Sequence, residues 1–366
     1  MTQEPLRVLH VETGRHLYGG AYQVLLLLRG LASLGVENIL CAPKNSAIAR
    51  AAAPYARLVP VEMHGEMDPR FPRSLWQAVT RWRPHLVHAH SRRGADWWSG
   101  WIARARHVPP LITRRVDNPE NPLPARIKYR PYQRIIAISE AIAEILKHQG
   151  IEAAKIRIVK SCIEPQRFNT PYPREKLLQD LGLPKDSLLI GTVAQLIPRK
   201  GHARLMDVVP AVTAHYSNAH FCFFGQGPLL ETLRRRAIEK KVTRHVHFLG
   251  FRKDMDRIFP CLDLVVHPAL MEGLGVCLLE AAAAGVPIVA FRAGGVPEVV
   301  HHGINGLLVN PEKGHELQAA ILHMLHSPNE ARRMGAQGRH LIRAHFSPEI
   351  MIQGNLAVYE EILEVS

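Results

Sequence analysis

The chain has 366 residues, of which 47% are hydrophobic; this length predicts two domains with a sizeable core, and no apolar stretch reaches the roughly 18–20 residues of a membrane span. Its five cysteines are scattered, with no Cys-x-x-Cys pair, so we expect a reducing cytoplasm and no structural zinc site. The N-terminus carries Glu4 and Pro5 directly before a strand pattern, so we expect a soluble protein without a signal peptide. The net charge of +14 is concentrated in residues 1–170, which hold 25 Lys and Arg against 13 Asp and Glu, and this indicates either a polyanionic partner or a solvated basic face.

Strand and helix patterns alternate through the first half of the chain. The run "LRVLHVE" (6–12) predicts a buried strand, and a Gly-Gly turn and the helical run "AYQVLLLLRGLASLG" (21–35) follow it. The alternation continues to "KIRIVKS" (155–161), which predicts an α/β domain with a doubly wound parallel sheet.

A polar, proline-rich segment, "SCIEPQRFNTPYPREK" (161–176), interrupts this pattern and is typical of a linker. A second alternation starts at "LLIGTVA" (188–194), and helices complete the chain. We therefore predict one α/β domain over residues 1–168, a second over residues 169–345, and a terminal helical segment over residues 346–366.

Three loops occupy the place where open parallel sheets bind ligands, beyond the carboxyl ends of the strands. One of them, "MEGLGVCLLE" (271–280), follows the strand "LDLVVHP" and carries Glu272 and Glu280. The loop "RHLYGGAYQ" places Gly19 and Gly20 before a helix, where backbone N–H groups can approach a phosphate. The loop "AQLIPRKGH" places Arg199 and Lys200 at a helix start. Cations there oppose the helix dipole, which indicates either an expected anion or two solvent-facing charges. The chain has neither a full Gly-x-Gly-x-x-Gly motif nor a P-loop, and this argues against an NTPase.

Two acids stand out in "EGLGVCLLEAAAAGVPIVA" (272–290). Glu272 precedes a Gly-Leu-Gly turn, and Glu280 interrupts an almost wholly apolar run. An ionised carboxylate is costly to desolvate without compensation, so either a buried partner such as an arginine or a ligand satisfies Glu280. Eight positions separate the two acids, a little over two helical turns, so we expect both to project toward one side.

These residues carry a resemblance to a known family. The segment "HPALMEGLGVCLLEAAAAGVPIVAFRAGGVPEVV" (267–300) matches the Glu, seven residues, Glu signature and the Gly-Gly-x-x-Glu loop of the family 4 glycosyltransferases. "GTVAQLIPRKGH", "FFGQGPLLETL" and "HFLGFRKDM" fall in the family's order, and "HAHS" (88–91) and "IAISE" (136–140) match its N-terminal domain. The chain resembles this family over essentially its whole length.

The resemblance implies the GT-B fold, in which two Rossmann-like doubly wound parallel-sheet domains face a central cleft. The first domain would bind the acceptor and the second a nucleotide-sugar donor, and the terminal helix would cross back to the first domain. Family members transfer the sugar with retention of configuration and generally without a metal ion, and the chain shows no Asp-x-Asp motif that would hold one.

The resemblance also implies a donor site. Glu280 would hold the ribose hydroxyls, and Glu272 would bind hydroxyls of the transferred sugar. The diphosphate would lie against Lys200 and the amides of Leu274 and Gly275.

Catalysis would follow from the departure of the diphosphate. Positioned cations and helix-terminal amides stabilise the charge that develops on the leaving phosphate, so the residues expected to act are Arg199, Lys200 and Glu272. Gly19 and Gly20 would let the diphosphate and the acceptor meet closely.

The chain departs from the family at two places, one in the linker and one in the second domain. Gln195, which the resemblance places among the donor-binding residues, stands where many members have an arginine, so Arg199 is expected to bind the donor as well and to supply the missing charge. "Ser-Cys-Ile-Glu" (161–164) replaces the usual Asn-Gly-Ile-Asp. His267, beside a proline, is expected to be structural.

A further departure concerns the acceptor side. "TRRVDN" (113–118) stands where many members carry Thr-x-His, so Arg114 or Arg115 is expected to bind a charged group of the acceptor or donor. His88 and His90 lie near the predicted cleft, and His90 is a candidate acceptor contact.

The basic first half points to a glycan acceptor that is lipid-linked or phosphorylated, such as an intermediate of lipopolysaccharide core or exopolysaccharide synthesis, and a UDP-sugar is the favoured donor. We expect peripheral binding to the anionic inner face of the membrane, with salt screening the attraction. The basic residues expected to contribute are Arg104, Arg106, Arg114, Arg115, Arg126, Lys128, Arg130 and Arg134.

Three other functions remain open at this point. A nucleotide-sugar 2-epimerase shares the fold but not the acid signature with its Gly-Gly loop. A nucleic-acid-binding protein would suit the charge, but only 6% of the residues are aromatic and single-strand binders interleave aromatic with basic side chains, so no nucleic-acid partner is expected. An inactive scaffold is disfavoured because the lysine and both acids occur together.

Overall fold

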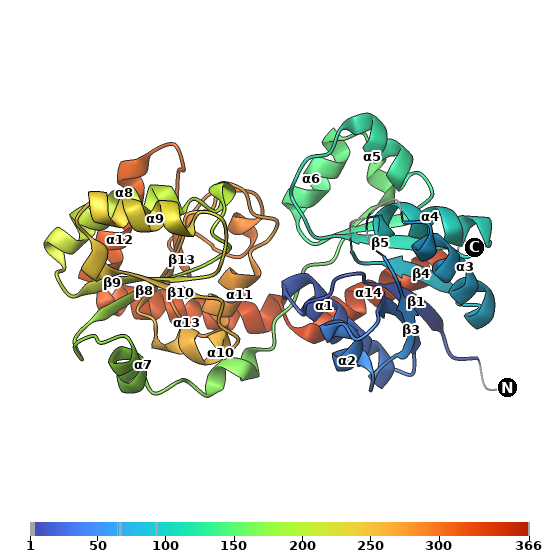
Figure 1. Cartoon of the computed structure of the whole chain (residues 1–366), viewed down its shortest axis with the longest axis horizontal. Helices are drawn as coiled ribbons and strands as arrows, with labels where there is room; N and C mark the ends of the chain where they lie inside the picture. The colour runs from blue at the N-terminus through green and yellow to red at the C-terminus, as the bar shows by residue number, and fades with distance from the viewer. Residues whose placement is uncertain (1–3, 64, 66–67, 92–93, 365–366) are drawn as a thin grey trace. The chain divides into compact units, whose positions relative to one another are not determined.

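The computed structural model describes residues 4–63, 65, 68–91 and 94–364 (Figure 1). The chain divides into two compact units, Met1–Cys162 with Pro348–Ser366, and Ile163–Ser347. We call these the first and the second unit. The chain passes between them after residues 162 and 347, where the sequence predicted 168 and 345.

Seven described strands form the parallel sheet of the first unit, in the spatial order β3-β2-β1-β4-β5-β6-β7. They are β1 (Arg7–Val11), β2 (Glu37–Pro43), β3 (Arg57–Val61), β4 (Leu86–Ala89), β5 (Pro110–Arg114), β6 (Arg134–Ala137) and β7 (Ile156–Ile158). The helices of this unit are α1 (Gly19–Ser33), α2 (Ala47–Ala52), α3 (Arg70–Trp82), α4 (Ala95–Ala105), α5 (Pro122–Tyr129), α6 (Glu140–His148) and α14 (Pro348–Glu364). Separate apolar clusters pack α1, α2 and α14 against the sheet on one side and α3 and α4 on the other (Figure 1).

The terminal helix α14 belongs to the first unit and lies along α1. Gly30 of α1 permits this contact, because a Cβ there would lie 2.0 Å from Cδ1 of Ile352. Glu361 adds polar contacts, 2.9 Å from Arg134 and 2.8 Å from Nε of Arg157. The helix therefore covers apolar side chains of the first sheet.

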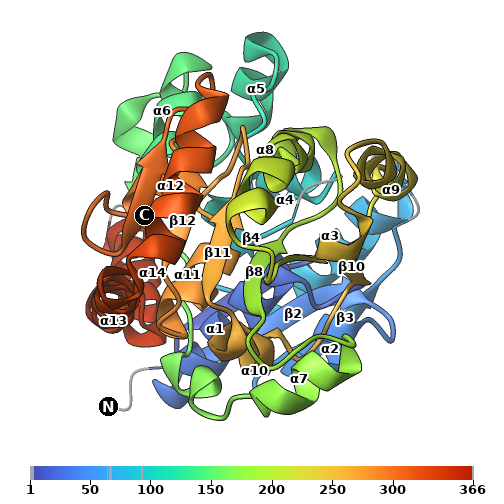
Figure 2. The same cartoon turned by 90° about the vertical axis from the view of Figure 1, so that its left-hand side faces the viewer.

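Six described strands form the parallel sheet of the second unit, in the order β10-β9-β8-β11-β12-β13. They are β8 (Leu188–Val193), β9 (Ala219–Phe224), β10 (Val246–Gly250), β11 (Leu264–His267), β12 (Ile288–Phe291) and β13 (Gly306–Val309). The helices are α7 (Arg174–Asp180), α8 (His202–His215), α9 (Leu230–Glu239), α10 (Met255–Ile258), α11 (Val276–Ala283), α12 (Gly314–His326) and α13 (Pro328–His345). Helices α8, α9 and α12 cover one face, and α11 and α13 pack together on the other (Figure 2).

The predicted fold class, two doubly wound α/β units with parallel sheets, is confirmed. Both sheets reverse their winding once, between β1 and β4 in the first unit and between β8 and β11 in the second. Such switch points open a crevice beyond the carboxyl ends of the strands. The loops that follow these four strands are therefore the places to look for a site.

Candidate active site

The loops after β8 and β11 carry most of the candidate residues of the second unit. Gln195, Arg199 and Lys200 follow β8, and Glu272 follows β11. The amide of Leu270 donates to the carbonyl oxygen of Arg199 at 2.9 Å. This hydrogen bond joins the two loops at the switch point of the sheet.

Glu272 is held between two basic side chains. Its Oε2 lies 2.6 Å from Nζ of Lys200 and 2.9 Å from Nε2 of His267. Burial raises the pKa of Glu272, but His267 and Lys200 outweigh burial and lower that pKa to about 2. Burial likewise opposes a charge on His267, yet Cys277, whose Sγ lies 3.7 Å from Nδ1, and Glu272 together raise the pKa of His267 to about 9. Glu272 is thus an ionised acceptor with a fixed orientation.

The loop that contains Gly294 and Gly295 packs against the backbone of Glu272. The amide of Gly295 donates to the carbonyl oxygen of Glu272 at 2.9 Å. A Cβ on Gly294, whose φ is +49°, would lie 2.1 Å from that same oxygen, and one on Gly295 would lie 2.2 Å from the carbonyl oxygen of Gly273. Only glycine permits so close an approach of two backbones, so this loop sets the position of Glu272.

Helix α11 begins directly after this turn with an open N-terminus. Gly275 is its N-cap, with φ 88° and ψ 68°, and the helix has neither a side-chain cap nor an acidic residue in its first turn. The side chain of Leu274 is buried, so Leu274 offers only its backbone to a ligand. The first amides of a helix lack partners within it and carry partial positive charge, which makes this end suitable for an anion.

Glu280 lies within α11 and is half-buried. Its carboxylate has no hydrogen bond or ion pair among the described residues, and burial raises its pKa to about 7, an effect that Arg167 reduces and Asp256 reinforces. Arg167 lies 3.3 Å from Asp256. The alternative in which an arginine pairs with Glu280 is therefore wrong within the described part of the chain.

Two expectations about these loops need correction. Glu272 and Glu280 do not share a helical face, because α11 begins only at Val276 and Glu272 lies in the preceding loop. Lys200 is not a solvent-facing charge, because its side chain is 11% exposed and pairs with Glu272. Arg199 is half-buried in a short 3₁₀ turn, Pro198–Lys200, and Gln195 is exposed.

The first unit contains a pocket of about 410 Å³ beyond β1, β4 and β5. Glu12, Gly20, His90, Ser91, Arg114 and Arg115 are among the residues that line it. Gly19 and Gly20 form the first turn of α1 and do not precede the helix as the sequence suggested. The pocket brings the acceptor candidates His90, Arg114 and Arg115 together in one place.

Arg114 and Arg115 differ in whether a protein group already compensates their positive charge. Arg114 is buried, and its Nη1 lies 3.0 Å from Glu120 and donates to the Tyr129 hydroxyl at 2.7 Å. Its charge is already compensated within the unit. Arg115 has a buried Nε without a hydrogen-bond partner among the described residues; burial lowers its pKa to about 10, against the opposing effect of Glu12, so Arg115 remains charged at neutral pH. Arg115 is thus the stronger candidate for a charged ligand group.

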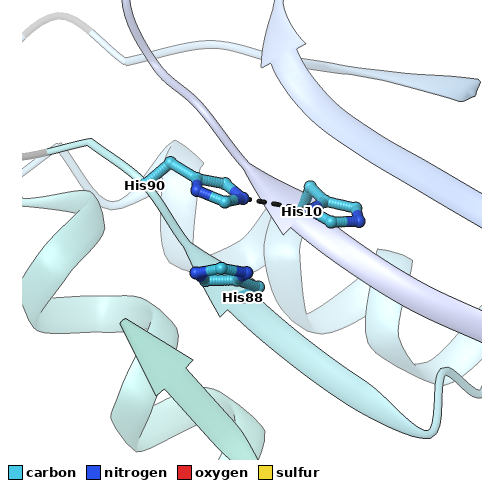
Figure 3. A group of neighbouring side chains, drawn as sticks. All are labelled: His10, His88 and His90. Carbon is cyan, nitrogen blue, oxygen red and sulfur yellow. Dashed lines mark hydrogen bonds between the residues drawn. The ribbon is translucent and has the colours of Figure 1, made fainter. Parts of the chain in front are cut away.

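Three buried histidines lie at the switch point of the first sheet (Figure 3). His10 of β1 and His88 of β4 are register partners, and His90 follows β4. Nδ1 of His10 lies 3.0 Å from Nε2 of His90, and the rings of His88 and His90 have centroids 3.8 Å apart. Candidate ligand atoms of all three lie within 4.8 Å of one another, a spacing that metal-binding histidines also show.

The basic segment 104–134 is less available to a membrane than the sequence suggested. Arg114 and Lys128 are 4% and 3% exposed, and Lys128 pairs with Asp96 and Glu120 at 3.1 and 2.6 Å. Neither can contact lipid. Within the described residues, no helix combines the length and apolar character needed to span a membrane.

Several residues of these sites were not identified from the sequence. His267 was expected to be structural, but it forms a hydrogen bond with Glu272. Its position at the end of a strand, five residues before Glu272, is the sequence feature that could have indicated this contact. Glu12, in the pocket after β1, and Tyr359, whose hydroxyl lies 2.8 Å from Nδ1 of His88, gave no signal, because their partners are distant in sequence.

Two family models match the chain: "Glycosyltransferase Family 4" over residues 18–167 and "Glycosyl transferases group 1" over residues 173–341. The GDP-mannose-dependent alpha-(1-6)-phosphatidylinositol monomannoside mannosyltransferase of Mycobacterium tuberculosis is 31% identical over 204 residues, which cover 53% of either protein. The chain thus spans about half the length of this relative. The D-inositol 3-phosphate glycosyltransferase of Mycobacterium marinum is 25% identical, over 93% of this chain and 76% of that protein.

A solved structure gives the same fold over nearly the whole chain. The crystal structure of Anabaena Alr3699/HepE in complex with UDP superimposes with a TM-score of 0.84 at 18% identity, over 97% of this chain and 100% of the other. At this identity the similarity concerns the fold alone.

Proposed function

The chain belongs to glycosyltransferase family 4, and on this basis we propose that it moves a hexose-type sugar from a nucleotide diphosphate sugar to a lipid-linked or phosphorylated glycan, with retention of configuration. The observation that carries this proposal is the ionised Glu272, held by Lys200 and His267 directly before the open N-terminus of α11.

The donor lies along α11 in this proposal. Glu280, which has no side-chain hydrogen bond among the described residues, accepts hydrogen bonds from the two ribose hydroxyls in its ionised form, which has acceptor sites on both oxygens and no donor. The amides of Leu274 and Gly275, directly before α11, and the cations Lys200 and Arg199 stabilise the negative charge on the leaving diphosphate. Glu272 binds hydroxyls of the transferred sugar, and none of these roles uses a metal ion.

The nucleotide base and the sugar are the open parts of the donor. The sequence favoured a UDP-sugar, whereas the mycobacterial mannosyltransferase is described as GDP-mannose-dependent. GDP-mannose and UDP-glucose are therefore the first donors to compare.

The acceptor binds in the first unit, at the pocket that Arg115 and His90 line. A phosphate group on the acceptor would form an ion pair with the charged Arg115. The names of both mycobacterial relatives refer to phosphorylated inositol compounds. Intermediates of lipopolysaccharide core or exopolysaccharide synthesis belong to the same chemical class.

Peripheral binding to an anionic membrane would bring a lipid-linked acceptor within reach. Helix α5 offers Leu123 and Ile127, which are 70% and 46% exposed, beside the exposed Arg126 and Arg130. Exposed apolar and basic side chains together are typical of helices that lie on a membrane surface, and each basic residue contributes about 1 kcal/mol.

Vesicle sedimentation tests this part. The double variant Arg126→Glu, Arg130→Glu should lose binding to anionic vesicles at low salt, while Arg333→Glu, at an exposed site of the second unit, should keep it. Equal binding of wild type to neutral and anionic vesicles would contradict membrane attraction.

A donor panel tests the transferase activity. GDP-mannose, UDP-glucose and UDP-galactose are each incubated with a mixture of phosphorylated and lipid-linked acceptors, and nucleotide release and sugar transfer are measured with and without EDTA. We expect transfer from one donor, unchanged by EDTA. Conversion of the donor sugar without acceptor would instead identify an epimerase, and binding of no donor by calorimetry would reject both.

A further inference from the structure

A chain of hydrogen bonds runs through the core of the first unit to the pocket. It begins at Asn38 of β2, whose Nδ2 donates to the carbonyl oxygens of Leu28 and Tyr55 at 2.9 and 3.1 Å. Carbonyl oxygens only accept, so these two bonds fix which end of the amide is nitrogen. Oδ1 of Asn38 then faces Nε2 of His10 at 3.2 Å.

The orientation of this amide determines the protonation of both histidines. Because Oδ1 of Asn38 only accepts, Nε2 of His10 carries the proton. A neutral His10 then has a lone pair on Nδ1, which accepts from Nε2 of His90 at 3.0 Å (Figure 3). A neutral His90 with its proton on Nε2 has a lone pair on Nδ1.

Both histidines are neutral in these surroundings. Burial lowers the pKa of His10 to about 3, and burial with the neighbouring His88, His10 and Arg115 holds the pKa of His90 well below its ordinary value. Nδ1 of His90 is therefore an unprotonated acceptor. It is buried and has no hydrogen-bond partner among the described residues, and His90 lines the 410 Å³ pocket.

The same bonds argue against a metal ion at the three histidines. A metal would need a lone pair from each ring, but Nε2 of His10 must donate to Asn38, and its Nδ1 already accepts from His90. His88 is bonded on both sides, to the hydroxyls of Tyr359 and Thr113 at 2.8 and 2.7 Å. The charge of Arg115 nearby adds repulsion against a cation.

We propose that Nδ1 of His90 binds a hydroxyl group of a sugar or polyol in the pocket, and that Asn38 and His10 are positioning residues that keep this nitrogen unprotonated. The identification of that polyol with the acceptor rests on the proposed function. Because Nδ1 of His90 offers a lone pair, it favours ligand groups that donate a hydrogen bond. It therefore accepts a hydrogen bond from a hydroxyl group and repels an unprotonated phosphate oxygen. Arg115, whose Nε lacks an acceptor, complements it, because a hydroxyl oxygen can accept from Arg115 while its hydrogen is donated to His90.

Nitrogen NMR of the ¹⁵N-histidine-labelled full chain tests the protonation states without any turnover. We expect protonated Nε2 and bare Nδ1 for both His10 and His90. A proton on Nδ1 of His90, or stoichiometric zinc that removes its bare-nitrogen signal, overturns the proposal.

Two small probes then test the ligand class. Adding myo-inositol should shift the Nδ1 signal of His90, and sulfate, a fully deprotonated anion that cannot donate a hydrogen bond, should leave it in place at the same concentration. A shift with sulfate, or with neither probe, rejects the hydroxyl subsite. Nucleotide-sugar binding by the same protein, measured in parallel, reports on the proposed function independently.

Two substitutions separate the binding role of His90 from a structural one. His90→Asn can place an amide oxygen near the position of Nδ1, whereas His90→Gln can place its amide near Nε2 and keep the contact with His10. With the acceptor found by the panel, His90→Gln should raise the acceptor KM by about 2- to 12-fold, the range for one hydrogen bond, and His90→Asn should raise it less. The reverse order would mean that the contact with His10, and not a ligand, explains His90. Both variants are first compared with wild type in thermal melts, and the NMR result stands if either fails to fold.

Discussion

Lowering the pH should weaken donor binding through Glu280. Its pKa is raised to about 7 by burial, with Arg167 and Asp256 as the nearby charges. A ribose diol offers two O–H donors, and the ionised carboxylate accepts both in charge-assisted hydrogen bonds, so the ionised form is the one that binds the donor tightly. A group with this pKa is about one tenth ionised at pH 6 and about nine tenths at pH 8, and the apparent Kd scales inversely with the competent fraction. The donor Kd should therefore be about tenfold higher at pH 6 than at pH 8.

Calorimetry with the nucleotide sugar alone measures this effect. The donor's diphosphate is esterified at both ends and does not titrate in this range, so the free nucleotide, whose terminal phosphate does, is avoided. At pH 7 binding should release about half a proton per donor, because the complex contains only ionised Glu280. Comparing the binding heat in two buffers of different ionisation enthalpy counts the protons.

Glu280→Gln is the matched control, because the amide has the same shape and does not titrate. The variant should bind the donor about 10- to 150-fold more weakly at pH 8, from the loss of a charge-assisted hydrogen bond, and its Kd should not change with pH. If the variant keeps the wild-type pH dependence, or if wild type shows none, Glu280 does not hold the ribose.

Three further predictions concern the Glu272 network. Lys200→Ala should lower kcat by about 100- to 1,000-fold, the range for one transition-state donor, with Lys200→Arg less affected; an unchanged kcat would remove Lys200 from catalysis. The folded pKa of Glu272, about 2, lies below its ordinary 4.5, and that of His267, about 9, lies above its ordinary 6.5. The ion pair of Glu272 and His267 therefore stabilises the folded state fully between pH 4.5 and pH 6.5, the ordinary pKa values of the two groups. This stabilisation is lost as the pH falls toward about 2 or rises through about 9. Glu272→Gln should flatten this dependence in thermal melts and lower kcat more than it raises KM; melts with the wild-type pH profile would show that the network is not charged. Gly294→Ala should lower the Tm, because its Cβ would meet a backbone oxygen, whereas Gly19→Ala, with nothing within 4 Å of its Cβ, should leave the Tm unchanged. Equal melts for both variants would contradict the close contact at Gly294.

The fold could be predicted because its information is local. Alternating apolar strands and amphipathic helices predict two parallel sheets, whereas the strand order that sets the switch points between β1 and β4 and between β8 and β11 comes from the structure. The rule that ligands bind beyond the carboxyl ends of parallel strands was enough to select the loops of Gly19, Lys200 and Glu272 from the sequence.

The contacts themselves depend on distances that sequence spacing does not contain. The spacing of Glu272 and Glu280 matches two helical turns, but Gly275 takes a left-handed conformation and starts the helix only after the first acid. Arg114 and Lys128 looked like free surface charges, but both turn inward to meet Glu120. The composition of a segment gives the number of its charged residues but does not show which of them form ion pairs.

The protonation states of two histidines, His90 and His267, depend on neighbouring groups that the sequence does not reveal. His90 and His267 each follow or end a buried strand at a switch point, and both are buried. In the first unit the nearest groups are other histidines and Arg115, so burial prevails and His90 stays neutral. In the second unit Cys277 and the Glu272 carboxylate, 2.9 Å away, contact His267, and its pKa rises instead. The same residue type at equivalent places in two similar sheets can thus serve as a bare hydrogen-bond acceptor in one and as a cation that orients Glu272 in the other, and the deciding difference is the charge of the groups that contact each ring.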